Sequence, residues 1–120
     1  AEAEVAHTRQ VKAVAYELIF NQRELESATL MRYASADSAF LSDRIAQAQA
    51  AIPPLVAQLA RLTRDNSDQQ LRVGEIKSLL EQRGLAVAAL LALPAGTVDR
   101  RAVDNLIQRS QVRARAEALI

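Results

Sequence analysis

The segment LSDRIAQAQAAIPPLVAQLARL, residues 41–62, has an apolar side chain at every third or fourth position. The spacings are 4, 3, 4, 3, 4 and 3, and the positions are Leu41, Ile45, Ala48, Ile52, Leu55, Leu59 and Leu62. This is the a/d heptad pattern of a helix that packs lengthwise against another helix. Pro53 and Pro54 fall inside the pattern, and proline removes a hydrogen-bond donor and clashes with the preceding turn. Because the register continues past both prolines, we expect a kink or a short break there and not a change of direction.

The segment before it, residues 5–33, also has helical periodicity. Its apolar stripe consists of Val11, Val14, Ala15, Leu18, Ile19 and Leu25. This three-four spacing predicts one amphipathic helix of about 30 residues, which is roughly 45 Å long. The pattern resets in residues 35–38, where Ser35 or Asp37 is a candidate cap for the helix that follows.

The polar run LTRDNSDQQLRV, residues 62–73, separates this seam from the next apolar segment. Asn66 or Ser67 can accept a hydrogen bond from the first free amides of a new helix. Gln69 or Gln70, at the third position, would complete a capping box. The run therefore predicts a turn between two helices.

A third helix follows, with Val73, Ile76, Leu80, Val87 and Leu90 at heptad spacing. Arg83 stands where this seam would place an apolar residue. The sequence LPAG, residues 93–96, ends the helix because proline and glycine together interrupt it.

We expect a fourth helix to begin at the cap Thr97, with Asp99 in its first turn, where a negative charge suits the helix dipole. Its inner face is predicted to comprise Val103, Leu106, Ile107 and Ser110. Aromatic residues make up only 3% of the chain while AVILMFWYC residues make up 50%, which favours close-packed helices over strands. The sequence thus predicts an all-α, up-down-up-down four-helix bundle with long helices, formed by residues 1–120 as one domain, with both chain ends at the same pole.

The charges nearly cancel, because 15 Lys and Arg residues face 14 Asp and Glu residues. The predicted last helix is richer in arginine, but acidic residues interrupt its basic residues and no aromatic platform accompanies them, so we expect a solvated face and no nucleic-acid partner. No apolar run approaches the roughly 18 to 20 residues of a spanning helix. Met31 is the only methionine, and we expect the chain to be a fragment of a longer protein.

Catalytic motifs are not recognisable in the sequence. His7 is the only histidine, and the chain has no cysteine and three isolated glycines, so we predict no catalytic residues, no metal site and no cofactor. Glu26 and Arg83 are the charges that fall near apolar stripes. They are candidates either for an ion pair or for contact with a small polar ligand, and we name them as the candidate ligand-binding residues.

The sequence resembles the third class of CHASE-type sensor domains. The family often has Leu-Thr-x-Asp-Asn-Pro followed by two glutamines between its second and third helices, and residues 62–70 read LTRDNSDQQ, with Ser67 in place of the proline. Glu26 and the AFL of residues 39–41 match a second family feature, although SATLMR at residues 27–32 departs from it and lacks the family's arginine there. Asp104 and the EAL of residues 117–119 resemble the family's last helix.

The resemblance implies a non-catalytic extracytoplasmic input domain of a bacterial transmembrane histidine kinase, on the periplasmic side of the inner membrane. Flanking transmembrane helices would anchor the domain, and a small molecule or a protein would be its signal. Two alternatives remain: the ligand-binding bundle of a chemotaxis receptor, and a soluble helical scaffold that binds partner helices through the seam of residues 41–62. Homodimerisation is a further hypothesis, motivated by the long heptad faces.

Overall fold

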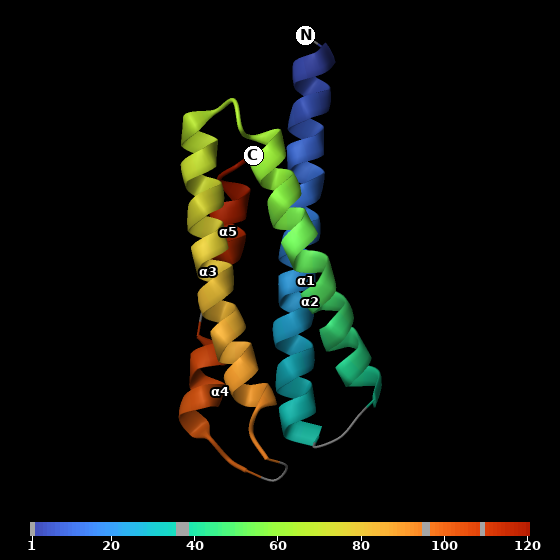
Figure 1. The fold of residues 1–120 in the computed structure, drawn as a ribbon, viewed down its shortest axis with the longest axis vertical. Helices are drawn as coiled ribbons and strands as arrows, with labels where there is room; N and C mark the ends of the chain where they lie inside the picture. Colours follow the sequence, from blue (N-terminus) through green and yellow to red (C-terminus); the bar gives the residue numbers. More distant parts are fainter. Residues whose placement is uncertain (1, 36–38, 95–96, 109) are drawn as a thin grey trace.

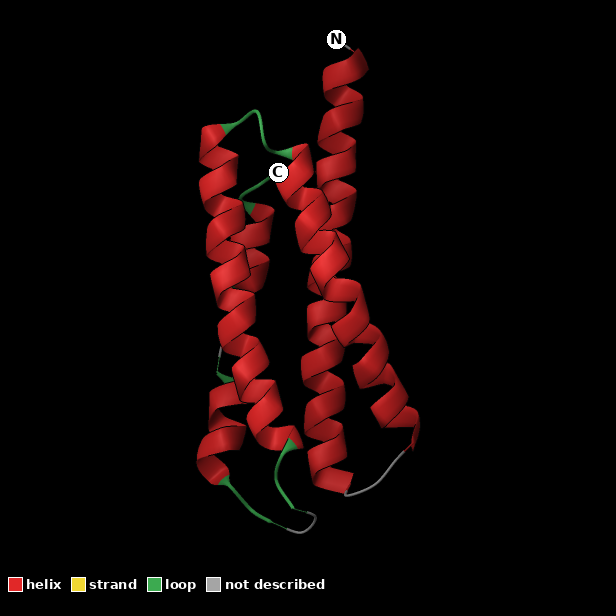
Figure 2. Ribbon diagram, viewed as in Figure 1, coloured by secondary structure: helices red, strands yellow, loops and turns green. Residues whose placement is uncertain are grey.

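The computed structural model of the chain describes residues 2–35, 39–94, 97–108 and 110–120. Helices account for most of these residues, and none of them forms a strand (Figure 2). The helices are α1 (Glu2–Ser35), α2 (Ala39–Leu62), α3 (Ser67–Leu91), α4 (Arg100–Ile107) and α5 (Val112–Glu117). The prediction of an all-α bundle is confirmed.

The helices form an elongated bundle with extents of 56 × 25 × 17 Å. In Figure 1, α1 descends from the N-terminus, α2 returns, α3 descends again, and α4 followed by α5 leads back toward the C-terminus. Both chain ends therefore lie toward the same end of the bundle, with the first turns of α1 projecting beyond the other helices. No helix among the described residues has the length and apolar character needed to cross a membrane.

The pair α1 and α2 makes the most extensive helix contact in the bundle. All six predicted stripe residues of α1 are buried, and so are all the seam positions of α2 except the half-buried Leu62. Leu18 and Leu59 are fully buried. Since the α2 seam is covered by the chain's own core, it is not exposed for binding a partner helix.

Pro53 and Pro54 lie inside α2, which continues through both of them without a break. The kink stays a prediction. Ser35, one of the two expected caps, instead belongs to the last turn of α1, where its hydroxyl donates to the Met31 carbonyl at 2.8 Å. The other, Asp37, lies outside the described residues.

Helix α3 begins as the polar run predicts, because the Asn66 side chain accepts from the Gln69 amide at 3.0 Å. The expected capping box is wrong. The Gln69 and Gln70 side chains have partners elsewhere in the fold, and the Asn66 amide donates to the Thr63 carbonyl instead. The predicted seam of α3 is correct: Val73, Ile76, Leu80, Val87 and Leu90 are all buried.

The last leg of the bundle differs from the single long helix that the sequence predicts. It consists of the two short helices α4 and α5, and Gln108 between them has a non-helical backbone with φ −49° and ψ 136°. Asp99 is itself the cap of α4, accepting from the Ala102 amide at 3.0 Å, so the prediction of Thr97 as the cap is wrong. Ile107, expected on the inner face, is 62% exposed, whereas Leu106 is buried. Val103 and Ser110 are half-buried.

Candidate functional site

The two candidate residues Glu26 and Arg83 meet between α1 and α3. The Arg83 Nε donates to Oε2 of Glu26 at 3.2 Å, and its Nη2 donates to Oε1. The two side chains are only 11% and 15% exposed. A two-pronged pair of this kind, largely withdrawn from water, joins helices that are far apart in the sequence.

Arg83 also donates to the backbone at the end of α4. Its guanidinium reaches the carbonyls of Leu106 at 2.6 Å, Gln108 at 3.2 Å and Asn105 at 3.3 Å. The last carbonyls of a helix have no partner within the helix, and a cation beside them is favoured by the helix dipole. Arg83 therefore supplies from α3 the cap that ends α4.

A buried glutamine completes this cluster. Gln22, one turn before Glu26 on α1, is 4% exposed and donates from Nε2 to Glu26 Oε2 at 2.6 Å. Oε2 thus accepts from both Gln22 and Arg83, and every hydrogen-bonding group of the pair points at protein. In this arrangement Glu26 and Arg83 form a clamp that connects α1, α3 and α4.

A cavity of about 200 Å³ adjoins the clamp. It is lined by Ile19, Gln22, Arg23, Glu26, Ser110, Val112 and Arg113. At its outer side the exposed Arg113 donates to Glu117 at 2.8 Å, and this hydrogen bond and charge raise the pKa of Arg113 above its ordinary value. The cavity has room for only a few waters or a very small polar molecule.

Residues of the polar run 62–73 form a second cluster. Thr63 is 1% exposed; its hydroxyl donates to the Leu59 carbonyl at 2.7 Å and accepts from Gln70 Nε2 at 2.9 Å. Gln69 Nε2 donates to the Leu119 carbonyl at 3.0 Å, and the exposed Arg72 donates to the Ala118 carbonyl at 2.6 Å. The bonds from Gln69 and Arg72 attach residues 118–119 to the first two turns of α3.

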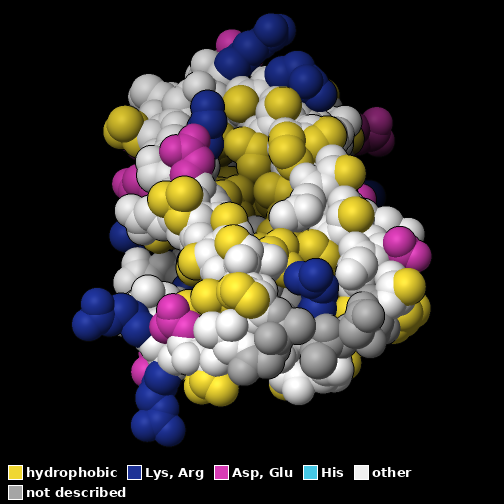
Figure 3. All heavy atoms as spheres, turned by 60° about the horizontal axis from the view of Figure 1, so that its bottom comes forward, with side chains coloured by type: hydrophobic (Ala, Val, Ile, Leu, Met, Phe, Trp, Pro, Cys, Tyr) yellow, Lys and Arg dark blue, Asp and Glu magenta, His cyan; other side chains and the backbone are white. Residues whose placement is uncertain are grey.

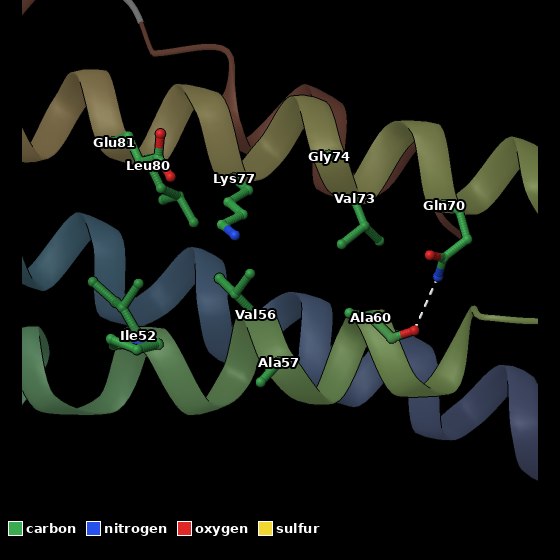
Figure 4. Close-up of a pocket in the computed structure, with 11 residues that line it drawn as sticks. Ile52, Val56, Ala57, Ala60, Gln70, Val73, Gly74, Lys77, Leu80 and Glu81 are labelled. Carbon is green, nitrogen blue, oxygen red and sulfur yellow. Dashed lines mark hydrogen bonds between the residues drawn. The ribbon is translucent and has the colours of Figure 1, made fainter.

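A larger groove of about 630 Å³ lies between α2 and α3 (Figure 4). One end of it is closed by Gln70, which donates to the Ala60 carbonyl at 2.9 Å. Its walls are formed by Ile52, Pro53, Val56, Ala57, Ala60, Val73, Gly74, Lys77, Leu80 and Glu81. It is separate from the clamp, which lies between α1, α3 and α4.

The family model of the CHASE3 domain matches residues 1–119. The chain belongs to the CHASE3 family. CHASE3 domains are extracellular sensory domains of signalling proteins, so this chain is a sensor input domain with an extracytoplasmic location. No curated protein and no solved structure matches it.

Sequence reasoning located some residues of these CHASE3 clusters and missed others. It singled out Glu26 and Arg83, which the fold brings together. It missed Gln22, although position 22 continues the three-four spacing between Leu18 and Leu25. It gave no reason to select Lys77, which becomes notable only when α2 and α3 are placed side by side.

Proposed function

We propose that this CHASE3 domain is the non-catalytic input module of a membrane-bound sensor histidine kinase in a two-component system. In this proposal the domain lies on the periplasmic side of the bacterial inner membrane and is anchored by flanking transmembrane helices. The family match over residues 1–119 carries the proposal. The position of both chain ends toward one end of the bundle is consistent with it.

Signal transmission would use the connection between the first helix and the last leg. Helix α1 packs against α5 and also contacts α4. The Glu26 and Arg83 clamp adds a polar connection from α1 to the end of α4. A signal that favours one of two packings of the bundle would therefore displace α1 and the last leg relative to each other.

Catalysis, cofactors and nucleic acid have no part in this proposal. We propose a homodimer in which two domains pair outside their cores, because the α2 seam is already buried. An apolar face is available on α1, where Tyr16 is 45% exposed and Phe20, one turn further on, is 62% exposed. Sedimentation of the domain at millimolar concentration tests self-association, and a monomer alone would count against a stable dimer of the isolated domain.

The reading frame on both sides of residues 1–120 tests the kinase assignment. We expect an apolar segment of about 20 residues on each side, then a helix pair with a phosphorylatable histidine and an ATP-binding region. Polar flanks would reject a membrane sensor and leave a soluble interaction module. A methylated coiled coil downstream would instead identify a chemotaxis receptor.

Autophosphorylation of the full-length protein in vesicles tests the role of the clamp. Arg83→Met is expected to change the basal autophosphorylation rate, because it removes the polar connection between α1 and the end of α4. Arg113→Met removes the exposed pair with Glu117 within α5 but leaves the Glu26–Arg83 clamp in place, so it is the control for losing an arginine beside the clamp. Equal rates for both variants and the unmodified protein would exclude the clamp from signal transmission.

A further inference from the structure

The groove between α2 and α3 exists because these neighbouring helices do not close against each other along their whole length. Helix α2 packs far more extensively against α1 than against α3. Several of the residues that face the opening are small, namely Ala57, Ala60 and Gly74. A side-chain carbon built onto Gly74 would meet no atom within 4 Å, so the space beside it is open.

The chemistry of the walls favours an aliphatic ligand. Ile52, Val56, Val73 and Leu80 present branched apolar side chains, and none of the aromatic residues that the structure describes lines the groove. Figure 3 shows hydrophobic side chains gathered in a hollow of the surface, with charged side chains at its rim. A volume of about 630 Å³ lies within the range of small-molecule sites, roughly 300 to 1,000 Å³.

One basic side chain, the solvent-exposed Lys77, lines this apolar space. In Figure 4 the Lys77 ammonium reaches from α3 toward Val56 of α2. It takes part in none of the ion pairs among the described residues. Glu81, one turn further along α3, lines the groove as well. Its negative charge disfavours a doubly charged phosphate more strongly than a single carboxylate.

We propose that this groove binds a linear aliphatic monocarboxylate, with the chain between α2 and α3 and the carboxylate on Lys77. This inference rests on the proposed sensor function, because the bound carboxylate would be the signal that the domain detects. Binding by the isolated domain does not depend on the output domain. Flanking sequences that contradict the kinase assignment would therefore leave the binding proposal intact, and a negative binding experiment would leave the kinase assignment intact.

The test is a titration of the domain with decanoate. Calorimetry measures the Kd, and backbone amide chemical shifts show which residues respond. We expect saturable binding with shifts centred on Val56, Val73 and Lys77, and a Kd about three- to fourfold tighter for each methylene added between octanoate and decanoate. Lys77→Gln should weaken decanoate at least tenfold while leaving decanol unchanged. Equal binding of decanoate and decylamine would overturn the assignment of a carboxylate.

Two glycines of α3 provide a matched pair of blocking variants. Gly74→Leu fills the groove and should reduce decanoate affinity more than tenfold. Gly84→Leu makes the same change on the same helix, also at a position with open space, but outside the groove lining, and should leave affinity unchanged. A helical circular dichroism spectrum for both variants separates blocking from unfolding.

Three results would reject the proposal. They are the absence of saturable binding at millimolar decanoate, equal affinities of the two glycine variants, and shifts confined to residues outside the groove. Sedimentation tests the alternative occupant, a second copy of the chain. A dimer that Gly74→Leu converts to monomer would assign the groove to that second copy and reject the carboxylate.

Discussion

Arg83 on α3 and Glu26 on α1 form a two-pronged ion pair whose guanidinium also caps the C-terminal end of α4. One side chain therefore satisfies a half-buried carboxylate and three backbone carbonyls. The remaining hydrogen-bond capacity of Glu26 is used by Gln22. Because removal of Arg83 leaves the half-buried Glu26 carboxylate and the end of α4 without these hydrogen bonds, we expect breaking this cluster to cost more than losing a surface pair.

Arg83→Met is expected to lower the free energy of unfolding by about 2–4 kcal/mol, because Glu26 loses its cationic partner and the carbonyls at the end of α4 lose the Arg83 donor. Urea denaturation followed by circular dichroism measures this change. Arg113→Met, which removes an exposed i,i+4 pair with Glu117, should cost less than about 0.5 kcal/mol. Similar losses for both variants would mean that the clamp contributes no more than a surface pair.

The interruption between α4 and α5 should depend on the same arginine. Residues 108–111 read QRSQ, with neither glycine nor proline, so local propensity does not require a break. In Arg83→Met we expect the Cα chemical shifts of Gln108, Ser110 and Gln111 to move toward helical values. Glu26→Gln, which keeps the arginine, should retain the break. Unchanged shifts in Arg83→Met would contradict this explanation.

The cap of α4 allows a direct comparison between the two candidate residues Thr97 and Asp99. Asp99→Ala should destabilise the domain by about 1 kcal/mol and accelerate hydrogen exchange at the Ala102 amide, because the side-chain acceptor is lost. Asp99→Asn keeps an acceptor and should have little effect. Thr97→Ala should be neutral within about 0.5 kcal/mol. A larger loss for Thr97→Ala than for Asp99→Ala would reverse the assignment.

The contact between α1 and α2 should dominate the stability of the core. Leu59 is 0% exposed, so Leu59→Ala is expected to cost about 3–5 kcal/mol through lost burial and a residual cavity. Leu71, 69% exposed on α3, is the matched control, and Leu71→Ala should change stability by less than about 0.5 kcal/mol. Chemical denaturation of both variants measures the difference. A cost below about 1 kcal/mol for Leu59→Ala would show that this helix contact is loosely packed.

Several features of the fold were predictable because they depend on neighbouring residues. The three-four spacing identified the buried faces of α1, α2 and α3, since residues three or four apart lie on one side of a helix. Asn66 was correctly proposed as a cap of α3. The assignment of Gln69 and Gln70 to a capping box failed because both side chains found partners brought close by the tertiary fold, one of them on Leu119.

The amino-acid sequence by itself determined that this protein is helical, which faces of the three long helices are buried, and where the turn between α2 and α3 lies. Periodicity and capping act within a few residues, so they can be read along the chain. Only the tertiary structure showed the division of the last leg into α4 and α5, where Arg83 donates to carbonyls 22 to 25 residues away. It also decided the groove, whose walls come from separate helices and whose width depends on how α2 and α3 pack around α1.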